Sequence, residues 1–374
     1  MPKSESHVKL GEESYRSHGG RIWQIARKTR RDPKEFLDFS ANINPLGPSP
    51  KAVSAIRESL WKLPYYPDSD STHLRQVIAR RLSTTLDNVV AGNGSTEIIH
   101  LFAEANLQPK GEAVIPQPTF AEYEAATRRF GGKPKFVFAG RKTLCLHLDK
   151  VAARVGSETE AVFICNPNNP TGELIEKNQM LELVEKTEDE NVPMLVDETF
   201  IEFSERENDS SLTHLAPKFP NLVVLRSFTK MYALTGLRIG FAIGHADMIE
   251  HILRRKEPWN VNCLAEAGAL ASLADKDYVR RTKELVQREK RFLQERLGRI
   301  PGLKPFPSEA NFILVCTQET GKTSREIQSS LIRRGIIVRD CSSFRGLGNN
   351  FIRVAVKRRK QNEKLMKALS AIVR

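Results

Sequence analysis

The sequence predicts an α/β protein with one large domain and one smaller domain. Its 374 residues are too many for a single simple hydrophobic core and suit two domains. From residue 89 onward, short apolar runs alternate with longer amphipathic segments, which is typical of a mostly parallel β-sheet covered by helices. After residue 262, a long helical region leads to a second, smaller set of strands. We therefore expect a large α/β domain followed by a smaller α+β domain.

The predicted elements follow in a regular order. Helices come first at 21–31 and 51–62, where apolar residues recur at helical spacing. The strands of the large domain are the apolar runs VVAG, AVIP, AVFICN, PMLVD, LVVLRS and IGFAIG. After a helical region at about 263–297, the strands ANFILVC, GIIVRD and FIRVAV precede a terminal amphipathic helix. This order predicts an N-terminal arm (1–44) that packs on the small domain and the active site, a large domain (45–262) and a small domain (263–374).

The net charge of +13 raises the question of an anionic partner. Basic surfaces attract nucleic-acid phosphates, yet the basic stretches at 27–31 and 357–360 lie far apart and carry no nucleic-acid-binding signature. Solvated helix ends or loops explain these stretches better, and the charge also helps to attract an anionic small substrate. We therefore expect a small-molecule partner, and neither a nucleic acid nor a membrane.

The composition is that of an ordinary globular protein, with 40% hydrophobic and 28% charged residues. No apolar run approaches the ~18 residues of a membrane span, and the N-terminus lacks a signal-peptide core, so we expect a cytoplasmic protein. The cysteines are odd in number and form no C-x-x-C pair, which predicts free thiols and no metal site. They are Cys145, Cys165, Cys263, Cys316 and Cys341.

Polar residues follow four predicted strands of the large domain. In open α/β sheets, ligands bind beyond the carboxyl ends of the strands, so these residues should meet at one edge of the sheet. They are Gly92 to Thr96 in GNGST, Asn166 to Gly172 in NPNNPTG, Asp197 with Glu198, and Ser227, Thr229 and Lys230.

Each of these groups has an ordinary explanation when it is taken singly. Ser95 or Thr96 suits a helix cap, Asn169 and Asp197 suit turns, and Lys230 suits a solvated loop. A single ligand explains them together, if it brings a phosphate for the hydroxyls, an aldehyde for Lys230 and a pyridine nitrogen for Asp197. Pyridoxal 5′-phosphate has these three groups, so we expect it as the cofactor.

Three motifs carry a resemblance to a known superfamily. NPNNPTG at 166–172, DETF at 197–200 and SFTKMY…GLRIG at 227–240 are, in this order, motifs of the fold-type-I, aspartate-aminotransferase-like pyridoxal-phosphate enzymes. The sequence resembles these enzymes over about residues 18 to 370. The resemblance implies a fold-type-I transferase, with a mostly parallel seven-stranded sheet in the large domain and a smaller α+β C-terminal domain.

Within this superfamily the chain most closely resembles the L-threonine-O-3-phosphate decarboxylases of cobalamin biosynthesis. The stretches that carry this resemblance include HGG at 18–20, YYPDSD at 65–70, AGNGSTE at 91–97, PWNVN at 258–262 and GIIVRDCSSFRGL at 335–347. Histidinol-phosphate aminotransferases share YPD and ANFIL, and they are the alternative family.

The resemblance assigns cofactor roles to residues of these motifs. Lys230 is the catalytic lysine that joins the aldehyde, and Asp197 is the catalytic partner of the pyridine nitrogen. Asn169 bonds the 3-oxygen of the ring, and Phe120 stacks on the ring face. The cofactor phosphate is held by Ser95, Thr96, Ser227, Thr229 and Arg238, and from a neighbouring subunit by Tyr66, which implies a homodimer.

Substrate contacts are expected from the N-terminal arm and the small domain. Arg353 interrupts the apolar strand FIRVAV, where a guanidinium is costly unless an anion meets it. Arg339 lies at the end of GIIVRD. A solvated strand end explains this arginine about as well as a substrate contact does. The resemblance adds the other expected contacts, which are His18, Gly19, Gly20, Asn44, Asn169 and Asn311.

One departure from the family pattern bears on the reaction. Many relatives have a tyrosine three residues after the aspartate, and its phenol bonds the 3-oxygen. This chain has Phe200 there, which supplies no donor. The substitution argues against a generic aminotransferase.

The substrate-orienting cations bear on the choice of reaction. The bond at Cα that breaks is the one held perpendicular to the conjugated plane, which is Cα–H in an aminotransferase and Cα–COO⁻ in a decarboxylase. We expect decarboxylation of L-threonine O-3-phosphate to (R)-1-amino-2-propanol O-2-phosphate for the cobamide nucleotide loop, and L-serine O-phosphate is a second candidate substrate. Amino transfer, as in histidinol-phosphate aminotransferases, is the alternative, and nucleic-acid binding is the alternative from another class.

Overall fold

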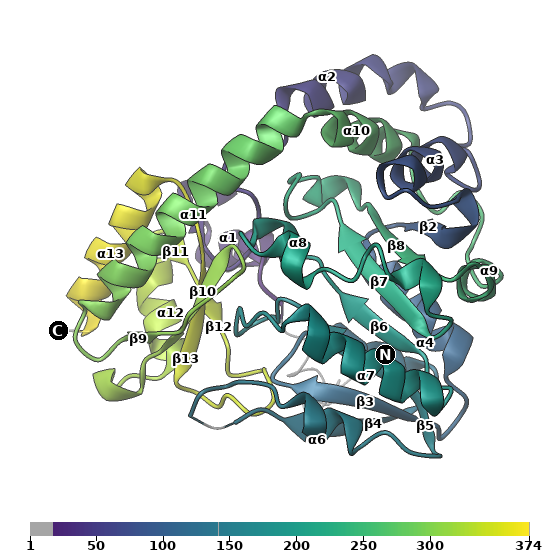
Figure 1. Cartoon of the computed structure of the whole chain (residues 1–374). Helices are drawn as coiled ribbons and strands as arrows, with labels where there is room; N and C mark the ends of the chain where they lie inside the picture. The colour runs from purple at the N-terminus through teal and green to yellow at the C-terminus, as the bar shows by residue number, and fades with distance from the viewer. Residues whose placement is uncertain (1–17, 141, 374) are drawn as a thin grey trace, which may run out of the picture.

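The computed structural model describes residues 18–140 and 142–373 (Figure 1). Seven strands form the large sheet in the order β2-β8-β7-β6-β5-β3-β4, in which β8 is antiparallel to both neighbours and the other neighbouring strands are parallel. The predicted fold class is therefore confirmed. The strands are β2 (Val89–Gly92), β3 (Glu112–Gln117), β4 (Lys133–Phe138), β5 (Thr159–Cys165), β6 (Met194–Asp197), β7 (Leu222–Ser227) and β8 (Gly240–Gly244).

Helices cover both faces of this sheet (Figure 1). Phe163 and Leu195 pack on one face, whereas the next residues along each strand, Ile164 and Val196, pack on the other. Because both faces are covered, β6 and β7 are buried along their whole length, which explains their continuous apolar runs. The first face carries α4 (Ser95–Asn106), α5 (Glu122–Arg129) and α9 (Ala246–Leu253), and the second carries α6 (Leu148–Ala152) and α7 (Lys177–Asp189).

A second sheet, which is antiparallel, lies beside the first in the order β12-β13-β10-β9 (Figure 1). Helices pack on this sheet through apolar residues such as Leu293, Leu331 and Leu369, as the α+β prediction requires. Its elements are β9 (Lys304–Pro305), β10 (Phe312–Cys316), β12 (Arg339–Asp340), β13 (Phe351–Ala355), α11 (Lys276–Gly298), α12 (Ser324–Arg333) and α13 (Arg359–Val373).

The N-terminal arm joins the smaller sheet region. β1 (Leu37–Asp38) pairs in parallel with β11 (Ile336–Ile337), and Ala26 of α1 (Ile22–Thr29) packs with Phe36 and Ile337. The first residues of the described chain are thereby held against residues that lie near its end. The boundary at residue 44 itself stays a prediction.

The helical region predicted at 263–297 consists of two helices. α10 (Cys263–Ala274) packs against α2 (Pro50–Glu58) and α3 (Thr72–Arg81), whereas α11 starts after Asp275 and extends to the smaller sheet (Figure 1). The predicted boundary at 262 therefore separates α10 from the helices that it contacts. One apolar cluster, which includes residues of α3 and α13, connects the two parts of the chain.

In the described part of the chain, no helix is long and apolar enough to cross a membrane. No group of three or more histidine, cysteine, aspartate or glutamate side chains is arranged there to hold a metal ion. The five cysteines, all of which lie in the described ranges, are unpaired.

Candidate active site

A cavity of about 700 Å³ lies where the carboxyl ends of the central strands meet the N-terminal arm and the smaller sheet. The strand register places Cys165, Asp197 and Leu225 beside one another, so the residues that follow β5, β6 and β7 converge. The predicted site residues that line the cavity are His18, Gly19, Gly20, Ser95, Thr96, Phe120, Asn169, Asp197, Thr229, Lys230, Arg238, Arg339 and Arg353.

Asp197, the last residue of β6, presents a buried carboxyl group to the cavity. The phenol of Tyr123 donates a hydrogen bond of 2.7 Å to its Oδ2, and the backbone N–H of Thr199 donates one of 2.9 Å to its Oδ1. Burial raises the pKa of Asp197, whereas the hydrogen bonds from Thr199 and Tyr123 and the charge of Lys230 oppose that rise. A carboxylate held in this way suits a cationic partner inside the cavity.

Lys230 follows β7 and projects into the same cavity. Burial and the charges of Arg353 and Arg238 lower the pKa of its amine, and Asp197 acts in the opposite direction, so that the pKa is about 8. Only a neutral amine attacks a carbonyl, and a lowered pKa increases the neutral fraction near neutral pH. The environment of Lys230 is therefore that of a nucleophilic lysine.

The beginning of α4 offers a site for an anion. The helix starts at Ser95 after Gly94, whose φ is 81°, and no side chain of the described residues caps its first backbone N–H groups. Ser95, Thr96 and Arg238 line the cavity at this point. A Cβ atom at Gly94 would come within 2.3 Å of Arg238 Nη2, so glycine permits both the backbone turn and the close approach of the guanidinium. Free N–H groups and a cation together attract a phosphate.

Two arginines enter the cavity from the smaller sheet as direct cross-strand partners, Arg339 in β12 and Arg353 in β13. Both are almost fully buried, with exposed fractions of 6% and 5%. The interpretation of Arg339 as a solvated strand end is therefore wrong. Burial lowers the pKa of both guanidinium groups, and that of Arg353 falls to about 10.

Arg353 uses only some of its N–H donors in hydrogen bonds to the described residues. Its Nη2 donates to the carbonyl of Ser40 at 3.0 Å and its Nη1 donates to Oδ1 of Asn169, whereas its buried Nε has no partner within the ranges that the structure describes. The neighbouring Arg339 donates to Ser343 Oγ at 2.7 Å. Because Asn169 uses its oxygen for Arg353, its N–H groups are the donors that remain to it.

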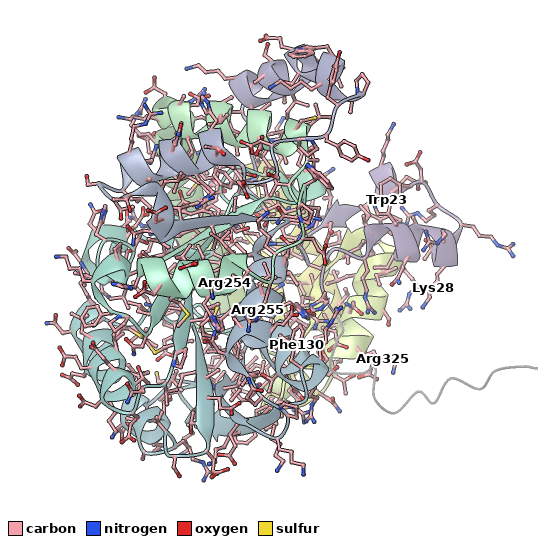
Figure 2. All side chains as sticks on the ribbon, turned by 90° about the vertical axis from the view of Figure 1, so that its right-hand side faces the viewer. Trp23, Lys28, Phe130, Arg254, Arg255 and Arg325 are labelled. Atoms are coloured by element: carbon pink, nitrogen blue, oxygen red, sulfur yellow. The ribbon has the colours of Figure 1, made fainter. Side chains whose placement is uncertain are left out.

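Aromatic rings form two walls of the cavity. Phe120 lies with its ring centroid 5.5 Å from that of His18 and 5.8 Å from that of Tyr123. Phe200 packs edge-on against Phe312 at 5.1 Å and presents an apolar edge to the cavity. Figure 2 shows Trp23, which lines the cavity and is 67% exposed, on α1 at the outside of the molecule.

His18 is held at the cavity by α5. Its Nε2 lies 2.7 Å from Oε1 of Glu122, and Nε2 of His100 lies 3.4 Å from Oε2 of the same carboxylate. Hydrogen bonds from His100 and His18 lower the pKa of Glu122 to about 2. The position of His18 is thus defined by a partly buried partner, which the lone histidine in the sequence did not reveal.

Two expected substrate contacts, Asn44 and Asn311, do not line the cavity, and their contact with a substrate stays a prediction. Asn44 is buried outside the cavity, where its Nδ2 donates to the carbonyl of Met231 at 2.7 Å and to Thr282 Oγ1 at 2.9 Å. Its backbone N–H donates to the carbonyl of Lys230, so Asn44 holds the loop that carries the lysine. Asn311 precedes β10, is fully buried and does not line the cavity.

Two expected phosphate ligands also lie outside this cavity. Ser227 is buried at the end of β7 with its hydroxyl 2.8 Å from that of Thr229, so it contacts a cavity residue and not the cavity itself. Tyr66 is 82% exposed and packs against Trp259, with 4.8 Å between ring centroids. Its expected reach into a neighbouring subunit stays a prediction.

The sequence reasoning missed several residues that the fold brings to the cavity or to its catalytic groups. Tyr123 is the clearest case, because it lies three residues after Phe120, and that spacing at the start of a helix places both side chains on one face. Glu122, which opens the helix after β3, and Ser343, which follows a strand of the smaller sheet, were also missed. All three owe their positions to contacts between elements.

The lining residues fit the expected cofactor. The uncapped start of α4 with Arg238 suits its phosphate, Asp197 suits its ring nitrogen, and Lys230 suits its aldehyde. Phe120 offers an aromatic face for its ring. The described residues thus supply a complementary group for each reactive part of pyridoxal 5′-phosphate.

Comparisons with known proteins agree with this arrangement. Residues 34–370 match the family Aminotransferase class I and II. A histidinol-phosphate aminotransferase from Methanothermobacter thermautotrophicus is 35% identical over 95% of this chain and 94% of its own length. A protein of Caldanaerobacter subterraneus, named provisionally as a threonine-phosphate decarboxylase, is 36% identical over 95% of this chain and 93% of its own length. The crystal structure of the histidinol-phosphate aminotransferase from Clostridium acetobutylicum superposes with a TM-score of 0.84 and 30% identity, over 90% of this chain and 99% of that one.

Proposed function

Because this chain belongs to the class I and II aminotransferase family, whose enzymes use pyridoxal 5′-phosphate, we propose that it uses this cofactor to decarboxylate a phosphorylated amino acid, L-threonine O-3-phosphate. The product is (R)-1-amino-2-propanol O-2-phosphate, and L-serine O-phosphate is a second substrate of the same kind. The bound cofactor supplies an electron sink for the charge that develops at the substrate Cα.

The observation that carries the proposal is the arginine pair in the smaller sheet. Arg339 and Arg353 are directly opposite each other on neighbouring strands, and both line the cavity. Among the described residues Arg353 has no ion pair, and its buried Nε has no hydrogen-bond partner, so burying this charge is costly unless an anion meets it. A phosphorylated amino acid brings two anionic groups, a phosphate and a carboxylate, to two guanidinium groups.

Residues of the cavity then have separate roles in the proposed reaction. Lys230 provides the amine that bonds to the cofactor and later carries a proton at its Nζ, and Asp197 keeps the ring nitrogen protonated. Arg339 and His18 would hold the phosphate of the substrate, while Arg353 would bind and orient its carboxylate. The start of α4 and Arg238 anchor the cofactor phosphate.

Phe200 favours the lyase over a general aminotransferase. It lines the cavity without a polar group, so the donors near the 3-oxygen reduce to the N–H groups of Asn169. The identity of 36% to the provisionally named decarboxylase supports the same choice.

Amino transfer from histidinol phosphate is the second candidate. It is favoured by the relatives that bear this name, at 32–35% identity, and by the likeness to the solved structure from Clostridium acetobutylicum. An amino acceptor such as 2-oxoglutarate carries two carboxylates, which would also suit the two arginines. Only a measurement of products separates the two reactions.

A homodimer completes the proposed site. Large apolar side chains with exposed fractions of 49–82% gather in one short segment and beside it, namely Leu60, Trp61, Leu63, Tyr65, Tyr66 and Trp259. Burying such a surface stabilises association. In the dimer, Tyr66 reaches the cofactor phosphate of the neighbouring subunit, and light scattering of the purified protein measures the assembly.

The test follows the two products separately. Purified protein loaded with pyridoxal 5′-phosphate is incubated with L-threonine O-3-phosphate, L-serine O-phosphate or histidinol phosphate, with and without 2-oxoglutarate. We expect CO₂ release from phosphothreonine at a rate that 2-oxoglutarate does not change. The Lys230→Ala variant serves as the inactive control.

The opposite result is equally clear. Glutamate formed from 2-oxoglutarate and histidinol phosphate, without CO₂ from either phosphorylated amino acid, would replace the decarboxylase by the aminotransferase. Absence of both products would contradict both candidate functions.

A further inference from the structure

The carboxyl group of Asp197 has a buried phenol as a partner, and neither the motifs nor the comparisons assign this phenol a role. Tyr123 is fully buried in the first turn of α5, and its hydroxyl donates to Asp197 Oδ2 at 2.7 Å. Its ring stacks on Phe163 with 5.4 Å between centroids and an interplanar angle of 15°. The phenol is therefore fixed in direction as well as in distance.

The groups around Asp197 keep the phenol of Tyr123 protonated, so that it acts as a neutral hydrogen-bond donor. Burial raises the pKa of Tyr123 well above its usual range, and the charge of Asp197 raises it further. Burial also raises the pKa of the Cys165 thiol, which lines the cavity beside Asp197. Lys230 is the cation whose charge acts on the carboxylate. At neutral pH, the hydroxyl of Tyr123 thus donates its proton in a hydrogen bond and does not release it.

This hydrogen bond bears on a proton that is shared inside the cavity. In the proposed function, Asp197 and the ring nitrogen of the cofactor hold one proton between them, and the electron sink is effective when the nitrogen has it. A hydrogen bond donated to a carboxylate favours its ionised form. The bond from Tyr123 therefore lowers the affinity of Asp197 for the shared proton.

We propose that Tyr123 is a positioning residue that keeps this proton on the ring nitrogen of the cofactor, through its hydrogen bond to Asp197. The inference rests on the proposed function, because it requires the cofactor nitrogen to face Asp197. The same short helix begins next to Phe120, which lines the cavity and lies edge-on to Tyr123 at 5.8 Å. The start of α5 thus serves both the ring face and the ring nitrogen of the cofactor.

The test measures the nitrogen directly. Wild type and Tyr123→Phe are loaded with pyridoxal 5′-phosphate labelled with ¹⁵N in the ring, and the NMR shift of that nitrogen is recorded against pH. Without the hydrogen bond from the phenol, Asp197 binds the shared proton more tightly, so at neutral pH the ¹⁵N signal of Tyr123→Phe is expected to move from the shift of a protonated ring nitrogen toward that of an unprotonated one. The affinity for the cofactor, measured by absorbance titration, is expected to fall by about tenfold.

A matched control separates this effect from a loss of buried hydrogen bonding in general. The phenol of Tyr232 is also buried, at 4% exposure, and donates to Glu202 Oε1 at 2.8 Å outside the cavity. Tyr232→Phe is expected to lower stability but to leave the nitrogen signal unchanged. An unchanged signal in Tyr123→Phe, or an equal shift in both variants, would overturn the proposal.

A second replacement keeps the packing intact. Incorporating 3-fluorotyrosine at position 123 makes the phenol a stronger donor, and at neutral pH the ¹⁵N signal should then stay at, or move further toward, the shift of a protonated ring nitrogen. A move toward the unprotonated shift would overturn the inference even if Tyr123→Phe failed to fold. A different result would contradict the proposed function itself. In that case the ring nitrogen is unprotonated in wild type and Asp197→Asn does not change its signal, so Asp197 is not its partner.

Discussion

Two neighbouring acids at the end of β6 have opposite surroundings. Glu198 is fully buried and saturated by the protein: its carboxylate accepts from Ser211 Oγ, from the backbone N–H of Leu212 and from Thr213 Oγ1, and it lies 2.9 Å from Arg226. Asp197 lines the cavity and has no ion pair among the described residues. Consecutive residues of an extended chain point to opposite faces of a sheet. Glu198 therefore stabilises the fold, whereas Asp197, its neighbour in sequence, lines the cavity.

The buried arginines repeat this contrast. Arg226 pairs with Glu198 and with Glu207 at 3.1 Å, and these charges raise its pKa although burial alone would lower it. Arg353 forms no ion pair within the described residues, and burial lowers its pKa to about 10. A buried charge that the protein pairs internally supports the fold, whereas one that it leaves unpaired marks the place of a ligand.

The largest effect is expected at Lys230. Replacing it in Lys230→Ala removes the amine that bonds the cofactor and later carries a proton, so turnover should fall by at least about 1,000-fold. Product formation and the absorbance of the bound cofactor are the measurements, and circular dichroism shows whether the variant is folded. Retention of a tenth of the wild-type rate would contradict the role of Lys230.

Arg226→Met tests the paired side of the comparison. It leaves Glu198 and Glu207 buried without their cation, which should lower the free energy of unfolding by about 3–5 kcal/mol in a urea titration. Arg291→Met is the control, because Arg291 pairs with Glu205 at the surface and should cost less than about 1 kcal/mol. Equal losses in both variants would remove the distinction between buried and exposed pairs.

Arg353→Met tests the unpaired side. No carboxylate loses its partner, so the free energy of unfolding of the cofactor-free protein should stay within about 1 kcal/mol of wild type. The KM for the phosphorylated amino acid should rise by about 30-fold or more, since a buried charged contact to the substrate is lost. An unchanged KM would show that Arg353 does not orient the substrate.

The smallest effect concerns the pH at which the cofactor joins the protein. The amine of Lys230 is protonated and unreactive below its pKa and neutral above it, so the rate of colour formation after pyridoxal 5′-phosphate is added should rise with pH around a midpoint near 8. Arg353 is one of the charges that lower this pKa. In Arg353→Met the midpoint should therefore move up by roughly half a unit to one unit. A midpoint near 10 in wild type would mean that burial does not act on Lys230.

Much of the fold and the main chemistry of the site followed from local sequence features. The apolar runs predicted the large sheet because both of its faces are covered, and the rule on strand ends located Asp197, Asn169 and Lys230. The family resemblance did not predict where every side chain lies. It assigned substrate contacts to Asn44 and Asn311, yet both side chains lie outside the cavity.

The sequence alone determined the alternation of strands and helices and the types of residue at the strand ends, because these depend on periodicity and on which side chains follow each apolar run. Only the tertiary structure decided that Arg339 is buried opposite Arg353, that Glu122 holds His18, and that Tyr123 donates to Asp197. The last two contacts join residues 104 and 74 positions apart, and the first depends on how two strands pair, so no local pattern encodes the direction in which these side chains meet their partners.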